Sequence, residues 1–222
     1  GRGGRRRGEE RRRAADAGLL TFAHRHRVDE IVVTDGTATG VRGRILAPDD
    51  SPRGVASNRD EIGDFGFAAQ AVIVTTGGIG GNRELVRQYW PADLGSPPEH
   101  MVTGVPEYVD GRGLDIAAAA GVRLVNRDRM WHYTEGLHNW DPIWPGHGIR
   151  ILPGPSSLWF DALGRRLPAP LYPGYDTIGT LRYLRTTPDI AGYDHSWLVL
   201  DQRIIEKEFA LSGSEQNPDI TG

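Results

Sequence analysis

Cysteine is absent from this 222-residue chain, which excludes disulfide bonds, thiolate catalysis and cysteine-ligated metal sites. Long apolar runs are also lacking: no stretch approaches the roughly 20 residues that span a bilayer, and no secretory signal sequence is recognisable. Lysine is nearly absent, since the 26 basic residues include only Lys207. The sequence therefore predicts a globular protein with no integral membrane segment, and the cytoplasm is its expected location.

The net charge of −3 conceals an uneven distribution. Residues 1–13 hold seven arginines against two glutamates, whereas the rest of the chain is acidic. A basic segment can bind nucleic acid or an acidic membrane surface, but this one has no interleaved aromatic side chains to stack on bases. We interpret residues 1–17 as a low-complexity, disordered lead and expect no nucleic-acid partner.

The most informative motif is a glycine-rich turn between an apolar run and a helix start. The β-branched residues within 68–75 predict a buried strand, and four glycines follow within residues 77–81. Asn82 is a good helix N-cap, and a helix is expected from there to Trp90. Free backbone N–H groups at such a corner bind phosphate groups. The corner predicts a site for a phosphate-bearing cofactor, with a purely structural strand–helix turn as the alternative.

The remaining segments predict a hairpin followed by short elements. Residues 19–33 and 37–46 should pair around an Asp35-Gly36 turn, and residues 47–66 are expected to form a loop or a frayed hairpin. Four further elements are expected: a helix at 113–120, a strand–turn–strand at 159–166, a strand at 197–201 and a helix at 202–211.

Two neighbouring segments give the corner a specific context. His26-Arg27-Val28 lies upstream in the first hairpin strand, and Val109-Asp110-Gly111 lies downstream before the short helix. This order resembles the flavoproteins of the fumarate reductase and 3-ketosteroid Δ1-dehydrogenase superfamily, over roughly residues 18–222. Three later segments are similar to a bacterial branch described as FAD-binding dehydrogenases, close to the ketosteroid dehydrogenases: 130–136, 154–161 and 212–218.

The resemblance implies a mixed α/β fold. Its expected parts are a partial Rossmann-like FAD/NAD(P)-binding domain and an α+β capping domain of the fumarate reductase type. The composition changes near residue 128, after which tryptophan, tyrosine and histidine become frequent. We therefore assign residues 18–127 to part of the FAD-binding domain and residues 128–222 to an incomplete substrate-capping domain.

FAD is the cofactor that the resemblance implies, and five positions match its binding residues. Val28 corresponds to a residue whose backbone contacts the adenine. Thr76, Gly77 and Gly78 correspond to the segment that approaches the cofactor closely, and Asp110 to an acidic residue beside the flavin nucleotide. Structural alternatives stay open: a core residue in a strand for Val28, and ordinary turns for the others.

The sequence departs from the family pattern in several places. Thr75 and Val109 stand where the family has alanine and glycine. No Gly-x-Gly-x-x-Gly follows an opening strand, and the chain ends at Gly222 where the family would continue. We therefore expect an internal fragment that does not hold FAD tightly alone, because the pyrophosphate site is missing.

The chemistry implied by the resemblance is hydride transfer between flavin N5 and a substrate carbon. His132 or Tyr133 falls at the substrate-carboxylate histidine of the fumarate reductases, but their proton-donating arginine falls near Gly174, which disfavours fumarate reduction. The aromatic-rich second half suits a small apolar cyclic substrate, a 3-ketosteroid or another cyclic enone. Tyrosines are the acid/base groups implied in that branch. His132, Tyr133 and Tyr172 are thus the candidate catalytic residues, unless the aromatic cluster only forms core.

Other interpretations remain. The chain can be a catalytically inactive, truncated remnant or an interaction module that does not bind FAD alone. An NAD-binding protein using Gly78-x-Gly80 would need a complete βαβ unit, which the sequence lacks. No metal site is expected, because the histidines have no acidic partner at ligand spacing. The sequence leaves open the substrate's identity, the electron acceptor, the reaction direction and the oligomeric state.

Overall fold

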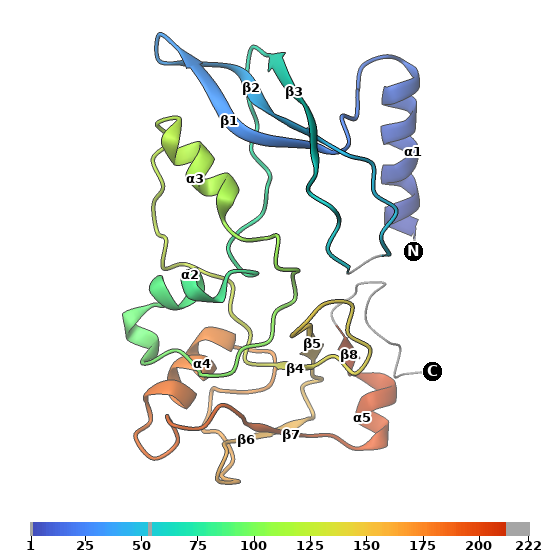
Figure 1. The fold of residues 1–222 in the computed structure, drawn as a ribbon. Helices are drawn as coiled ribbons and strands as arrows, with labels where there is room; N and C mark the ends of the chain where they lie inside the picture. Colours follow the sequence, from blue (N-terminus) through green and yellow to red (C-terminus); the bar gives the residue numbers. More distant parts are fainter. Residues whose placement is uncertain (1, 53–54, 212–222) are drawn as a thin grey trace. The chain divides into compact units, whose positions relative to one another are not determined.

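The computed structural model describes residues 2–52 and 55–211 (Figure 1). These residues contain both helices and antiparallel strands, which agrees with the predicted mixed α/β class. The chain divides into two compact units: residues 1–50 with 57–72, and residues 51–56 with 73–222. The predicted domain boundary near residue 128 falls inside the second unit. The motif at residues 212–218 lies outside the described residues.

The first unit contains a three-stranded antiparallel sheet in the order β1-β2-β3. Its strands are β1 (His26–Thr34), β2 (Thr37–Leu46) and β3 (Glu61–Ala68). The predicted hairpin is confirmed, and the two turn residues, Asp35 and Gly36, both have positive φ, at 50° and 75°. Such a two-residue turn matches the twist of the strands it joins. β3 begins within the residues expected to form a loop or a frayed hairpin, and its pairing along β2 stabilises a strand that its own glycines disfavour.

A helix, α1 (Arg2–Asp16), precedes the sheet. This differs from the disordered lead that the low-complexity composition predicted for residues 1–17. Arginine, glutamate and alanine all have high helix propensity, and Arg13 pairs with Glu9 one turn earlier at 3.7 Å. These residues favour a helix, although the three glycines of α1 disfavour it.

The predicted buried strand at residues 68–75 is wrong. β3 ends at Ala68, and residues 69–80 contain no strand. The side chain of Ile73 is 86% exposed and that of Val74 is 42% exposed. A buried strand needs hydrogen-bonding neighbours for its backbone, and no described strand pairs with this segment. The β-branched residues favour an extended backbone, but no described strand is positioned to pair with them.

The second unit consists of short elements joined by long loops. They are α2 (Arg83–Gln88), the 3₁₀ turn η1 (Ala92–Leu94), α3 (Arg112–Ala119), β4 (Gly136–His138), β5 (Gly148–Leu152), β6 (Leu158–Phe160), α4 (Thr177–Thr186), β7 (Trp197–Val199), α5 (Gln202–Lys207) and β8 (Ala210–Leu211). Two small antiparallel sheets form, β4-β5-β8 and β6-β7. Buried apolar side chains of this unit include Leu94, Ile149, Trp159, Leu181 and Ile190.

Most predicted elements of this unit are present with shifted ends. α2, α3, β6, β7 and α5 each lie within or beside the residues expected for them. α4 was not predicted; it begins where Asp176 accepts a hydrogen bond from the Gly179 N–H at 2.8 Å. Among the described residues, no helix combines the length and apolarity needed to cross a bilayer.

Candidate functional site

The glycine corner and the segment that carries Asp110 are joined within the second unit. The Gly81 N–H donates to the Val109 carbonyl at 2.9 Å. Asn82 Nδ2 donates to the Asp110 carbonyl at 3.4 Å, and Asn82 Oδ1 caps α2 by accepting from the Leu85 N–H at 3.1 Å. The structure thus brings together two motifs that the sequence analysis connected only by their order.

Close packing requires glycine at several positions of this corner. A Cβ at residue 81 would lie 2.4 Å from the Pro106 carbonyl oxygen, and one at residue 113 would lie 1.9 Å from Thr76 Oγ1. Gly77 has a φ of +81°, a backbone conformation that favours glycine. The structural interpretation of the glycine turn is therefore sufficient for Gly77, Gly81 and Gly113.

Gly78 is different. A Cβ built there has no atom within 4 Å, and its φ lies outside the left-handed region. Within the described ranges, the backbone amides of Gly77 and Gly78 donate no hydrogen bond. Neither packing nor backbone strain in the described residues explains the glycine at residue 78.

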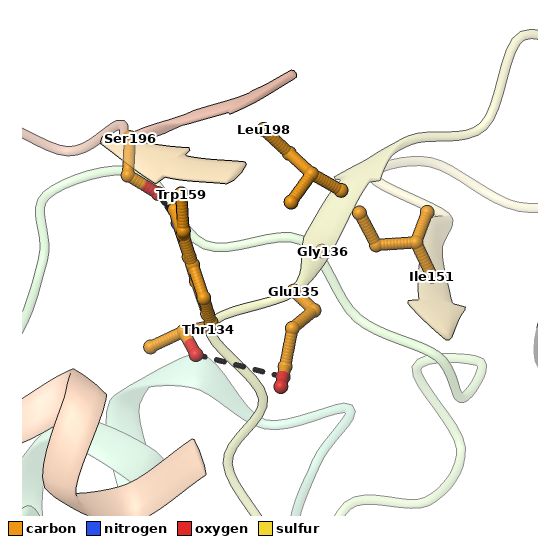
Figure 2. A pocket seen from close by; sticks show the side chains of 7 residues that line it. All are labelled: Thr134, Glu135, Gly136, Ile151, Trp159, Ser196 and Leu198. Carbon is orange, nitrogen blue, oxygen red and sulfur yellow. Dashed lines mark hydrogen bonds between the residues drawn. The ribbon is translucent and has the colours of Figure 1, made fainter. Parts of the chain in front are cut away.

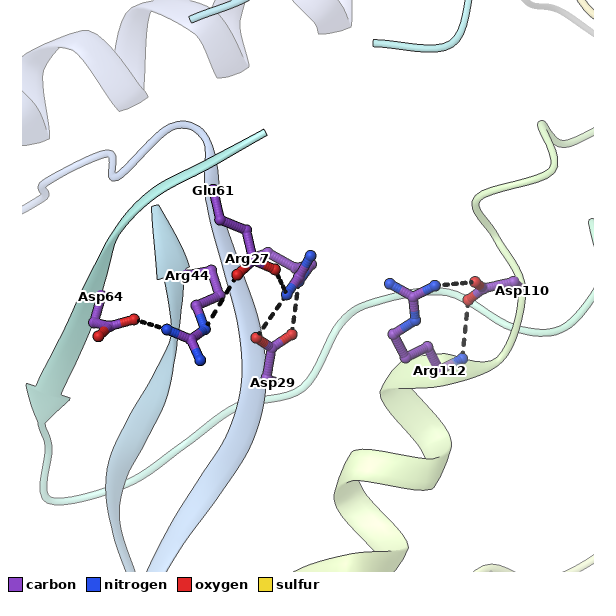
Figure 3. Close-up of polar contacts among 7 residues, drawn as sticks. All are labelled: Arg27, Asp29, Arg44, Glu61, Asp64, Asp110 and Arg112. Carbon is purple, nitrogen blue, oxygen red and sulfur yellow. Dashed lines mark hydrogen bonds and ion pairs between the residues drawn. The ribbon is translucent and has the colours of Figure 1, made fainter. Parts of the chain in front are cut away.

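The Asp110 carboxylate is engaged by its own loop. It accepts from the Arg112 backbone N–H at 3.0 Å and from Arg112 Nη2 at 3.3 Å (Figure 3). These bonds satisfy one of the free N–H groups at the start of α3. They hold the loop that Asn82 ties to the corner, so the ordinary-turn interpretation of Asp110 has direct structural support.

Val28 belongs to the first unit and lies at an irregularity of β1. The pairing with β2 shifts between Val28 and Glu30, which marks a β-bulge. Beside the bulge, Arg27 bonds Asp29 and Glu61, each at 2.7 Å (Figure 3). These two acids raise the pKa of Arg27 above its usual value. The Val28 side chain is 36% exposed, so Val28 is not the core residue that a plain strand would make it.

The three candidate catalytic residues lie in the second unit, each with its own neighbours. His132 is partly buried, with its ring centroid 4.6 Å from that of Trp90. Burial lowers the pKa of His132, and its Nε2 has no partner among the described residues. The guanidinium of Arg150 lies 4.0 Å from the ring centroid of Tyr133. Tyr172 is exposed, with its ring centroid 6.4 Å from that of Tyr175.

A small pocket of about 50 Å³ is lined in part by the residues that directly follow His132 and Tyr133 in the sequence. It is lined by Thr134, Glu135, Gly136, Ile151, Trp159, Ser196 and Leu198 (Figure 2). Ligand-sized pockets enclose roughly 300 Å³ or more. The pocket therefore accommodates water-sized molecules and is too small for a cyclic substrate.

Glu135 is the functional group that sequence reasoning missed in this pocket. Its side chain belongs to a residue that is 3% exposed, and its Oε1 accepts from the Thr177 hydroxyl at 3.0 Å. A buried carboxylate is costly unless donors satisfy it. The sequence alone does not indicate this hydrogen bond, because Thr177 lies 42 residues away in the helix α4, which was not predicted.

A comparison with protein-family models assigns the chain to a family. A family model described as "FAD binding domain" matches residues 7–222. This chain belongs to the FAD binding domain family. The predicted flavoprotein resemblance and the FAD cofactor are thereby confirmed.

Curated relatives of this FAD binding domain are steroid dehydrogenases by name. The chain is 61% identical over 210 residues to a KsdD-like steroid dehydrogenase of Mycolicibacterium smegmatis, covering 95% of this chain and 38% of that protein. It is 58% identical over 211 residues to a KsdD-like steroid dehydrogenase of Mycobacterium tuberculosis, covering 95% and 37%. The chain therefore spans little more than a third of the relatives' length. No solved structure matches it.

The corner of this FAD binding domain fits a phosphate-bearing cofactor. Gly78 leaves open space beside two backbone amides without acceptors in the described part of the chain. Free amides are the usual protein donors to phosphate oxygens. α2 has only six residues, so any anion affinity would come from these amides more than from the helix dipole. No group of His, Asp and Glu in the described ranges is arranged to hold a metal ion.

Proposed function

We propose that the protein containing this chain is an FAD-dependent dehydrogenase that acts on a CH–CH bond next to a ketone. The proposed substrate is an apolar ring system such as a 3-ketosteroid. The observation that carries this proposal is the 61% identity to a KsdD-like steroid dehydrogenase over 95% of the chain. Because the chain covers 38% of that relative, the proposal concerns the whole protein.

In the second unit, the amides of Gly77 and Gly78 approach the cofactor beside Thr76, whose side chain packs on Gly113. Asp110 is fixed against the same corner through Asn82. In the first unit, Val28 is the proposed contact with the adenine, and it lies beside the bulge of β1. FAD, when bound, supplies the hydride acceptor.

The chain's own residues would supply orientation and the proton. Tyr133 is the first candidate, because its ring is fixed by the Arg150 guanidinium while its side chain stays partly exposed. A phenol held in this way can take or give a substrate proton. Burial lowers the pKa of His132, which favours its neutral form, and its Nε2 without a partner among the described residues makes it the second candidate. Tyr172 is exposed and remains the third.

The test is product analysis with the protein expressed as its gene encodes it. Purified protein is incubated with a 3-oxo steroid and an artificial electron acceptor, and the product is analysed by mass spectrometry. The proposal predicts loss of two hydrogens and formation of a ring double bond. Bound FAD without any change in the steroid would reject this substrate class while leaving the flavoprotein assignment intact.

A second candidate is a module that does not bind FAD by itself. It is favoured by the lack of a Gly-x-Gly-x-x-Gly after any described strand and by the exposed Ile73 beside the corner. Residues 1–222 and the complete gene product are purified in parallel and their flavin content is measured. Flavin in the longer protein alone supports this candidate for the isolated chain, whereas flavin in both rejects it.

A further inference from the structure

Thr103 joins the glycine corner to the hairpin formed by β4 and β5. Its side-chain hydroxyl lies 3.1 Å from the Gly80 carbonyl oxygen, within hydrogen-bond distance. Its backbone N–H donates to the Gly146 carbonyl at 2.9 Å, and its own carbonyl accepts from the Gly148 N–H at 2.9 Å. In the part of the chain that the structure describes, no backbone N–H donates to the Gly80 carbonyl. Thr103 therefore contacts the corner through its side chain and the hairpin through its backbone.

The Thr103 hydroxyl also shapes the turn that follows it. It accepts from the Val105 N–H at 3.2 Å and lies 3.0 Å from the Val105 carbonyl oxygen. A hydroxyl has one proton, so it donates to the Gly80 carbonyl or to the Val105 carbonyl at any one time. A Cβ at residue 80 would lie 2.9 Å from Val105 Cγ2. The approach of residues 103–105 to the corner thus depends on both the hydroxyl and the missing side chain at residue 80.

The hairpin loop between β4 and β5, residues 139–147, is cross-linked within itself and to Thr103. Nδ1 of the buried His147 accepts from the Ile143 N–H at 3.2 Å. The His147 ring stacks on Trp144 with their centroids 3.9 Å apart, and Trp144 Nε1 donates to the Thr103 carbonyl at 3.3 Å. Because these contacts connect both ends of the loop, a displacement of Thr103 is passed to the loop as a whole.

Strand β5 leads from this loop to a candidate catalytic residue. A Cβ at residue 148 would lie 2.6 Å from Val102 Cγ2, so glycine at the start of β5 allows the segment that contains Thr103 to pack closely on the strand. Two residues further along β5, the Arg150 guanidinium lies 4.0 Å from the Tyr133 ring centroid. A continuous series of contacts therefore runs from the glycine corner through Thr103 and β5 to Tyr133.

We infer that Thr103 is a positioning residue, which sets the place of the Tyr133 ring relative to FAD bound at the glycine corner. This inference rests on the proposed function and adds to it a residue that acts through Tyr133. A misplacement of about 1 Å can lower a reaction rate about a hundredfold. Loss of the hydroxyl should therefore slow flavin reduction much more than it weakens FAD binding, because the amides of Gly77 and Gly78 are unchanged.

The test removes the hydroxyl and keeps the shape of the side chain. Native protein, Thr103→Val and Thr103→Ser, each as the complete gene product, are compared for FAD affinity and for the rate of flavin reduction at saturating 3-oxo steroid. Thr103→Val should reduce its flavin about 10- to 100-fold more slowly with little change in FAD affinity. Thr103→Ser keeps the hydroxyl and should restore most of the rate. The control is Thr186→Val, which removes a hydroxyl bond to the Arg182 carbonyl at 2.7 Å in α4 and should leave the rate unchanged.

Hydrogen exchange measures the same connection without turnover. Amide exchange in residues 139–147 is compared between apoprotein and FAD-bound protein. Local opening of a loop becomes rarer when the structure bonded to it is held, so FAD should slow exchange in this loop in native protein and in Thr103→Ser. In Thr103→Val, FAD should leave exchange in the loop nearly unchanged.

The possible outcomes separate the inference from the proposed function. A native rate in Thr103→Val, or an equal loss of rate in Thr103→Ser, overturns the positioning role. Loss of FAD from Thr103→Val also overturns it, because Thr103 would then act on cofactor binding. Loop exchange that FAD does not slow in native protein overturns it without any variant. Flavin that the steroid fails to reduce in native protein rejects the proposed reaction, while slowed exchange that depends on the Thr103 hydroxyl still supports the connection.

Discussion

The side-chain amide of Asn82 joins two motifs by donating from Nδ2 to the Asp110 carbonyl at 3.4 Å. Its other end, Oδ1, accepts from the Leu85 N–H and caps α2. One residue thus fixes both the start of the helix and the loop that carries the proposed cofactor residue Asp110.

Substitution at Asn82 should separate its two roles. Asn82→Ala removes both the helix cap and the hydrogen bond to the Asp110 carbonyl. Loss of the cap should lower the free energy of unfolding by about 1 kcal/mol. Loss of the hydrogen bond should weaken FAD binding. Asn82→Asp keeps the cap but removes the Nδ2 donor, so it should retain stability and still bind FAD less well. Thermal unfolding and flavin titration of the apoprotein measure the two effects. Equal FAD affinity of Asn82→Asp and native protein would show that the hydrogen bond from Asn82 to the Asp110 carbonyl does not contribute to FAD binding.

Gly78→Ala should weaken FAD binding without unfolding the protein. A methyl group at residue 78 meets no protein atom, so stability should change by less than about 0.5 kcal/mol, as at other unconstrained sites. The same methyl would occupy the space that a closely approaching cofactor needs. The matched control is Gly81→Ala, whose Cβ would lie 2.4 Å from the Pro106 carbonyl oxygen and should destabilise the fold. Unchanged FAD affinity in Gly78→Ala would remove residue 78 from the proposed site.

Local signals in the sequence predicted some of these features correctly. The Asp35-Gly36 turn depends on two adjacent residues that tolerate positive φ, and the hairpin formed as expected. The Asn82 cap depends on one side chain and the helix beside it, and it is present at the expected residue. Both features are decided by neighbouring residues, which is why a single sequence was enough to find them.

Other features depend on residues far apart in the chain. The apolar run at residues 68–75 could become a buried strand only beside other strands, and no described strand pairs with it. Glu135 is held by Thr177 from a helix whose pattern was not recognised. The stacking of the Arg150 guanidinium on the Tyr133 ring likewise became visible only in the structure. Pairings of this kind follow from tertiary packing, which residue spacing does not encode.

Tyr133→Phe should reduce turnover while FAD stays bound. Loss of a positioned proton-transfer group typically costs a factor of about 10² to 10⁴, and the phenylalanine ring preserves the contact with Arg150. Tyr172→Phe is the comparison, because Tyr172 is a candidate of the same chemical type without that contact. Rates of dye reduction and flavin absorbance are measured on the same samples. Full activity in Tyr133→Phe would exclude its hydroxyl from the proton transfer.

Asp161 should make stability depend on acid pH. Burial alone would raise the pKa of this carboxyl, but hydrogen bonds from the Arg165 backbone and guanidinium and from the Leu163 N–H outweigh burial and lower it. A lowered folded-state pKa stabilises the protein above the unfolded value of about 3.9, and this stabilisation disappears as the pH falls through the folded-state pKa. Asp161→Asn should therefore cost about 2 kcal/mol at neutral pH.

The same substitution provides its own control in acid. As the pH falls below the unfolded value and through the lowered folded-state pKa, the difference in unfolding free energy between Asp161→Asn and native protein should shrink, because protonation removes the charge of Asp161 in the native protein while the asparagine is neutral throughout. Denaturant unfolding at neutral and acid pH measures this difference. A difference that stays constant across this range would assign the effect to packing and not to the charge of Asp161.

The central claim is that this chain forms part of a flavin site whose protein dehydrogenates an apolar cyclic ketone. Its most direct test is anaerobic reduction of the FAD in the complete gene product by a 3-oxo steroid, followed by flavin absorbance. We predict that the oxidised flavin band disappears when the steroid is added, and that Gly78→Ala protein contains less flavin at the outset. Protein that holds FAD but keeps its oxidised band unchanged with the steroid would contradict the account.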